Sequence, residues 1–97
     1  MELERLQQEA HRIAREHGFW EGLRNVGELI ALMHSELSEA LEAYRANDHT
    51  NLGEEMADVV IRVADFCEAY QISLADAVQK KMKQNESRPY RHGGKLA

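Results

Sequence analysis

The feature that most constrains the fold is a helix-start signal that occurs three times along this chain of 97 residues. At each place, a residue whose side chain can cap a helix stands three positions before an acid. The pairs are Asn25 with Glu28, Asn51 with Glu54, and Ser73 with Asp76. An apolar stripe nearer the start of the chain predicts one more helix, which His17-Gly18 ends. The sequence therefore predicts an all-α fold.

Four helices are expected, over about 2–16, 26–46, 52–70 and 74–87. The short polar connection NDHT makes the second and third helices antiparallel neighbours. Proline occurs once, at Pro89, and a helix cannot continue through it. We therefore expect a single α-helical domain over residues 1–87, followed by a basic, flexible tail over 88–97.

Long apolar helix faces on so short a chain predict a partner, most simply a second copy in a homodimer or homotetramer. No apolar run approaches the ~20 residues that cross a bilayer. The opening MELERLQQEAHR also lacks a signal-peptide pattern. The single Cys67 lies in an apolar pattern and is interpreted as a reduced core residue. These features predict a cytoplasmic protein with no membrane partner.

Charge is unevenly distributed along the chain. Residues 1–79 carry 6 Arg, no Lys and 16 acids, a net charge of −10, whereas residues 80–97 carry +5. The acidic body disfavours binding to a nucleic acid polymer. The basic end is compatible with a local anion site or with a solvated tail.

Two pairs of acids lie at the edges of apolar helix faces. At ~100° per residue, Glu36 and Glu39 share one edge of the second helix, and Glu55 and Asp58 lie at the margin of the third. Four converging carboxylates repel one another unless cations lie among them. Oxygen ligands suit Mg²⁺ or Mn²⁺ better than Zn²⁺. The pattern thus predicts a metal site, with two solvated helix edges as the alternative.

Two arginines are placed to pair with acids on their own helices. On the helical wheel, Glu42 lies on the polar back of the second helix, and Arg45 follows it by three positions. Arg62 lies one turn beyond Asp58 and is expected to pair with it.

The last helix turns from apolar to basic along one face, ending in Lys81, Asn85 and Arg88. Such a face suits phosphate oxygens, although basic residues also collect at helix ends to complement the helix dipole. Trp20, in the loop GFWEGLR, can stack on a nucleobase or anchor the loop. His92 in the tail can contact a phosphate or lie in solvent.

SELSEALEA followed by EEMADVVIRVADF resembles the MazG-like, all-α nucleoside triphosphate pyrophosphohydrolases. Their signature is E-E-x-x-E on one helix and E-x-x-D on the next. Glu36 and Glu39 match the last two acids of the first motif, and Glu55 and Asp58 match the second. The chain departs from the pattern at Ser35, and Glu42 or Glu54 is a candidate replacement for the missing acid. KMKQNESRPYRHGGK resembles the family's C-terminal ending, so the resemblance covers about residues 17–95.

The resemblance implies hydrolysis of a nucleoside or deoxynucleoside triphosphate to the monophosphate and pyrophosphate, in nucleotide-pool house-cleaning. It implies a homodimeric helical bundle, with a dimer of dimers as an alternative, and Mg²⁺ held by Glu36, Glu39, Glu55 and Asp58. Glu36 and Glu39 would then serve a metal-activated water in catalysis. Lys81, Asn85, Arg88 and Lys95 would contact phosphate. A non-enzymatic dimerisation or regulatory module, or a nucleotide sensor without turnover, remains the alternative, because Ser35 replaces an acid.

Overall fold

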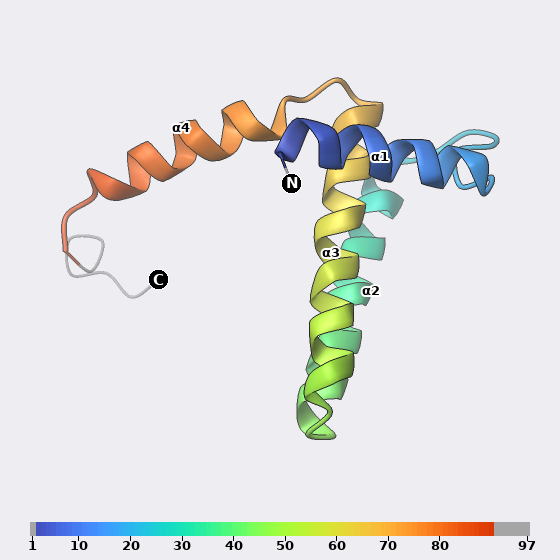
Figure 1. Ribbon diagram of the computed structural model, residues 1–97, viewed down its shortest axis with the longest axis horizontal. Coiled ribbons are helices and arrows are strands. Elements are labelled where there is room, and N and C mark those ends of the chain that lie inside the picture. Colours follow the sequence, from blue (N-terminus) through green and yellow to red (C-terminus); the bar gives the residue numbers. More distant parts are fainter. Residues whose placement is uncertain (1, 91–97) are drawn as a thin grey trace.

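The computed structural model describes residues 2–90, which form helices and connecting loops without a strand (Figure 1). The helices are α1 (Leu3–Glu16), α2 (Val26–Arg45), α3 (His49–Ala69) and α4 (Leu74–Glu86). The prediction of an all-α chain with four helices is confirmed. In this part of the chain no helix has the length and apolar content needed to cross a membrane.

Side-chain caps fix two helix starts where the sequence placed them. Asn25 accepts a hydrogen bond from the backbone N–H of Glu28, and Ser73 accepts one from that of Asp76. The predicted cap at Asn51 is wrong, because α3 begins three residues earlier. Asp48 caps it instead, accepting from the backbone N–H of Asn51 at 3.1 Å.

The α2–α3 connection is tighter than the sequence suggested. Asn47 adopts a left-handed φ of 58°, a conformation that asparagine tolerates better than most residues. The chain therefore reverses within three residues, and His49 and Thr50 of the expected NDHT loop join α3.

The helices form a packed trio with one projecting arm. α2 and α3 run side by side, α1 crosses α3 near one end, and α4 extends away from the other three helices (Figure 1). The Cα radius of gyration is 15.8 Å, larger than the ~13 Å of a compact domain of this size. The buried apolar residues are small apart from one leucine: Ala10, Leu29, Ala40, Ala43, Ala64 and Cys67. Cys67 is therefore the buried, free thiol that was predicted.

The broad apolar face of α2 does not pack on α3. Ile30, Leu37, Leu41 and Tyr44 are 43–65 % exposed, whereas Leu29, Ala40 and Ala43 are buried. The two alanines allow close approach of the helices, so the narrower edge of α2 forms the seam with α3. Glu36 and Glu39 share this edge and are consequently carried into the seam.

A buried glutamine fixes the start of the α4 arm. The Gln7 side chain on α1 donates to the backbone carbonyl of Ile72 at 2.8 Å and accepts from the backbone N–H of Leu74, also at 2.8 Å. Gln7 is 4 % exposed, so these bonds are shielded from water. The loop between α3 and α4 is thereby attached to α1.

Candidate metal centre

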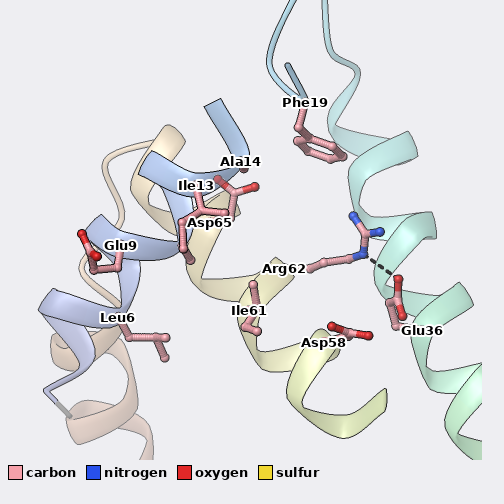
Figure 2. Close-up of a pocket in the computed structure, with 11 residues that line it drawn as sticks. Leu6, Glu9, Ile13, Ala14, Phe19, Glu36, Asp58, Ile61, Arg62 and Asp65 are labelled. Carbon is pink, nitrogen blue, oxygen red and sulfur yellow. Dashed lines mark hydrogen bonds and ion pairs between the residues drawn. The ribbon is translucent and has the colours of Figure 1, made fainter. Parts of the chain in front are cut away.

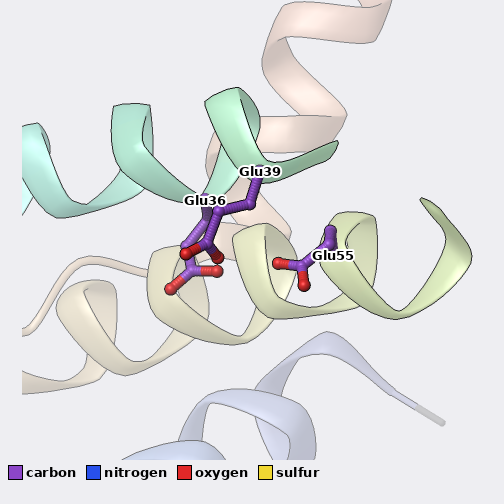
Figure 3. Close-up of side chains that lie close together, drawn as sticks. All are labelled: Glu36, Glu39 and Glu55. Atoms are coloured by element: carbon purple, nitrogen blue, oxygen red, sulfur yellow. The ribbon is translucent and has the colours of Figure 1, made fainter. Parts of the chain in front are cut away.

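Three carboxylates meet in the α2–α3 seam. Glu36 and Glu39 project from α2 and Glu55 from α3 (Figure 3). Each offers one oxygen, and these three oxygens lie within 4.8 Å of one another. The spacing of three residues keeps Glu36 and Glu39 on one side of α2, and the antiparallel packing brings Glu55 opposite them. We call these three residues the acidic cluster.

The surroundings of Glu55 in the acidic cluster disfavour its charged form. Burial disfavours its charged form and raises its pKa to about 7, and a hydrogen bond with Glu39 adds to the rise. The negative charges of Glu39, Asp58 and Glu36 act in the same direction. Its Oε2 is buried and has no hydrogen-bond partner among residues 2–90. A carboxylate oxygen in this position suits a cation, which would satisfy it and offset the repulsion.

Asp58 lies beside the acidic cluster but is not one of the residues whose oxygens lie within 4.8 Å of one another. It is exposed, follows Glu55 by one turn of α3, and its charge raises the pKa of Glu55. The structure therefore gathers three of the four predicted ligands closely and places the fourth next to them.

Arg62 pairs across the seam. Its Nε donates to Glu36 Oε1 at 2.8 Å, so its partner is Glu36 on α2 and not the predicted Asp58 on its own helix (Figure 2). The long arginine side chain spans the narrow seam, whereas an exposed pair within α3 would gain little. The predicted pair of Arg45 with Glu42 is confirmed at 3.3 Å on the exposed surface of α2, but Glu42 also lines a hollow that it shares with Glu39 and Glu55.

Hollows flank the acidic cluster on two sides. One, with a volume of about 470 Å³, lies between α1 and α3 and has the side chains of Glu36, Asp58 and Arg62 in its wall (Figure 2). Its remaining lining is mainly apolar: Leu6, Ala10, Ile13, Ala14, Phe19 and Ile61, with Glu9 and Asp65. The other, of about 510 Å³, is lined in part by Glu39 and Glu55. Small molecules can therefore approach the carboxylates from either side.

The predicted phosphate-binding residues lie elsewhere in the chain. Lys81, Asn85 and Arg88 are exposed on α4 and just beyond it, and α4 projects away from the α2–α3 pair (Figure 1). One chain folded this way does not bring them to the acidic cluster. Lys95 and His92 fall outside the described residues, as does most of the predicted tail.

Trp20 is tied to a buried acid that sequence reasoning missed. Its Nε1 donates to Asp65, with distances of 2.9 and 3.1 Å to the two carboxylate oxygens. His11 Nδ1 lies 2.8 Å from the same carboxylate. The Trp20 ring also makes edge contacts with His11, Phe19 and Tyr70. This geometry fits the anchoring interpretation of Trp20, and stacking on a nucleobase stays a prediction.

The sequence carried one signal for this network. Asp65 interrupts the apolar run VVIRVADFC, and an acid on an apolar helix face requires a partner when buried. The sequence holds no comparable signal for the hydrogen bonds of Gln7 or for the pairing of Arg62 with Glu36 on α2.

Ser35 occupies the position where the resemblance places another acid. It is exposed, and its hydroxyl donates to the backbone carbonyl of Ala31 at 3.3 Å within α2. Of the two suggested replacements, Glu42 is engaged by Arg45 and Glu54 is exposed near the start of α3. Neither belongs to the acidic cluster.

The model of one protein family, the MazG nucleotide pyrophosphohydrolase domain, matches residues 24–92. The matched region includes α2, α3 and α4 with the whole acidic cluster, and it leaves out α1 and Trp20. Neither a curated protein nor a solved structure matches the chain significantly.

Proposed function

Since this chain belongs to the MazG nucleotide pyrophosphohydrolase family, we propose that it converts nucleoside or deoxynucleoside triphosphates to monophosphates and pyrophosphate in a Mg²⁺-dependent reaction. A house-cleaning role in the cytoplasmic nucleotide pool follows from this activity. The observation that carries the proposal is the convergence of three carboxylate oxygens within 4.8 Å in the α2–α3 seam.

The donor set fits a hard divalent cation. All candidate ligands are carboxylate oxygens, and the buried Glu55 Oε2 has no other partner. Glu36, Glu39 and Glu55 would hold the ion, with Asp58 beside them, and Mn²⁺ fits the same ligands. When bound, Mg²⁺ would lower the pKa of a water molecule and offset negative charge on the phosphate oxygens.

The residues of the acidic cluster also supply the proton acceptor. Water attacks the α-phosphorus, the bond to the oxygen that bridges to the β-phosphorus breaks, and pyrophosphate leaves. Glu36 or Glu39 takes the proton that the attacking water gives up. Glu39 is exposed and lines an open hollow, so a phosphate chain can reach it without displacing the helix.

Assembly of two chains would complete the site. The exposed apolar side chains of α2 and α3 include Leu37, Leu41 and Val60, which suits a helical bundle formed by a second copy. In such a homodimer, or a dimer of dimers, the α4 arm of one chain can bring Lys81 and the other basic-end residues to the acidic cluster of its partner. Those residues are Lys81, Asn85, Arg88 and Lys95, and they would contact the triphosphate oxygens.

Calorimetric titration of Mg²⁺ tests the metal site. Wild type should bind the ion, and Glu39→Gln should bind it at least tenfold more weakly, because a charged ligand is lost. Glu28→Gln is the matched control: the same change on the same helix, at an exposed acid in its first turn. Equal affinity in wild type and Glu39→Gln contradicts the proposal.

The reaction itself is tested with a panel of NTPs and dNTPs in the presence of Mg²⁺, with pyrophosphate release as the readout. Turnover of at least one substrate, reduced strongly in Glu39→Gln and unchanged in Glu28→Gln, is expected. Absence of release from every nucleotide at high protein concentration would exclude the enzymatic proposal.

A second candidate is a non-enzymatic dimerisation or nucleotide-sensing module. Ser35 favours it, because its hydroxyl is used within α2 and, in the described part of the chain, no other acid joins the acidic cluster in its place. Nucleotide binding measured by calorimetry, without pyrophosphate release, would support the sensor over the enzyme.

A further inference from the structure

Arg62 is an arginine that forms an ion pair with the acidic cluster, through Glu36. Among the ion pairs formed by residues 2–90, the Arg62–Glu36 pair is the one that joins an arginine to a member of the cluster. The Glu36 side chain is only 12 % exposed, so its charge is poorly screened by water. Arg62 therefore offsets part of the repulsion among the carboxylates in the metal-free chain.

The contact between Arg62 and Glu36 is a single one. Only Nε engages the carboxylate, at 2.8 Å, so the pair lacks the two parallel hydrogen bonds of a bidentate arginine. The two terminal nitrogens of the guanidinium point away from Glu36 toward Phe19 (Figure 2). Breaking one hydrogen bond from the partly exposed Arg62 side chain costs less free energy than breaking a buried bidentate ion pair.

The released side chain has space beside it. Arg62 lines the hollow of about 470 Å³ between α1 and α3, which leaves room for rotation of the arginine. Its guanidinium carbon already lies 5.6 Å from the centroid of the Phe19 ring, but the guanidinium carbon of Arg24 lies closer to that ring, at 4.1 Å. Movement off Glu36 would thus take the Arg62 guanidinium into the solvent of this hollow, near Phe19.

We propose that Arg62 competes with the divalent ion for Glu36 and thereby sets the affinity of the acidic cluster for metal. Two cations on one poorly screened carboxylate repel each other, and the divalent ion gains more from the three clustered oxygens than Arg62 gains from one. Ion binding moves Arg62 off Glu36 into the hollow that Phe19 also lines. The inference rests on the proposed metal site and adds a residue that tunes it.

Calorimetry with Mg²⁺ tests the competition directly. Removing the positive charge that pairs with a candidate metal ligand should tighten binding by about five- to tenfold in Arg62→Ala. Arg62→Lys keeps the charge and should stay near the wild-type affinity. Arg45→Ala removes an arginine from an exposed pair within α2 and is the matched control, expected within about twofold of wild type.

The sole tryptophan reports the movement. The Trp20 and Phe19 ring centroids are 5.4 Å apart, so a change at Phe19 alters the surroundings of Trp20. Addition of Mg²⁺ should change Trp20 emission in wild type, and this change should be lost in Arg62→Ala. The measurement needs no nucleotide and is independent of turnover.

The outcomes separate the two proposals. Absence of Mg²⁺ binding by wild type overturns both the metal site and the role of Arg62. Binding by wild type, with equal or weaker binding by Arg62→Ala, overturns the competition and leaves the proposed function standing. Binding without a change in Trp20 emission overturns the movement of Arg62 near Phe19. If circular dichroism shows that Arg62→Ala is unfolded, Arg62→Gln replaces it, because glutamine keeps a donor without the charge and should show the same gain in affinity.

Discussion

Replacing Asp65 by alanine should destabilise the fold more than any exposed acid can. Asp65 is 6 % exposed and receives the Trp20 Nε1–H, with His11 Nδ1 at 2.8 Å on the same carboxylate. Through these contacts α3 holds both α1 and the loop that follows it. The substitution removes the acceptor but leaves the donors in place.

The expected loss follows from the cost of an unsatisfied donor, about 1–3 kcal/mol for each buried group. The Trp20 ring makes edge contacts with three aromatic rings, so loss of its bond to Asp65 should lie at the upper end of that range. The His11 side chain is 19 % exposed, so water can replace part of its bond. We expect a loss of about 2–5 kcal/mol in the free energy of unfolding, a large fraction of the ~5–15 kcal/mol typical of a domain.

Urea unfolding followed by far-ultraviolet circular dichroism measures this loss. Glu54→Ala, an exposed acid on the same helix, is the control and should change stability by less than ~0.5 kcal/mol. In a Trp20→Phe background, which lacks the indole donor, Asp65→Ala should cost ~1–2 kcal/mol less than in wild type. An equal cost in both backgrounds would refute the reasoning, because the two residues would then act independently.

Three further expectations follow from the same geometry. Because the pKa of Glu55 is raised to about 7, the folded chain keeps a proton that the unfolded chain loses near pH 4.5. Thermal stability without divalent ions should therefore fall as the pH rises from about 4.5 to 7, and Glu55→Gln should abolish most of that fall; an unchanged profile would contradict the raised pKa. Gln7→Ala leaves a loop carbonyl and the Leu74 amide without partners and should cost about 2–4 kcal/mol, with faster hydrogen exchange at Leu74 as the specific sign. Leu41→Lys places a charge on the exposed face of α2 and should shift an oligomeric wild type toward monomer in light scattering, whereas a monomeric wild type would remove this interface.

Much of the candidate site could be predicted because its determinants are local. The three-residue spacing of Glu36 and Glu39 places them on one side of a helix whatever the helix packs against. The same holds for Glu55 and Asp58 on α3. The resemblance to MazG-like proteins was carried by these two motifs, and the match over residues 24–92 confirms it.

Residues that act across elements could not be assigned in the same way. Arg62 had an apparent partner, Asp58, on its own helix. Only the packing of α2 on α3 shows that Glu36 lies within hydrogen-bond distance of Arg62. Gln7 contacts residues 65 and 67 positions further along the chain, a separation that leaves no periodic signal. The start of α3 also differs from the prediction, because Asp48 and Asn51, three positions apart, are both residue types that can cap a helix.

The sequence by itself determined that the chain forms four helices, where most of them begin, and which acids share an edge. Caps, helix pitch and residue spacing act over a few residues, so they are readable without the rest of the fold. Only the tertiary structure decided that the alanine-bearing edge of α2 faces α3, because that choice depends on how closely two helix backbones can approach. This packing converts two acidic edges into one cluster, leaves the larger apolar side chains exposed for a partner, and brings Arg62 to Glu36.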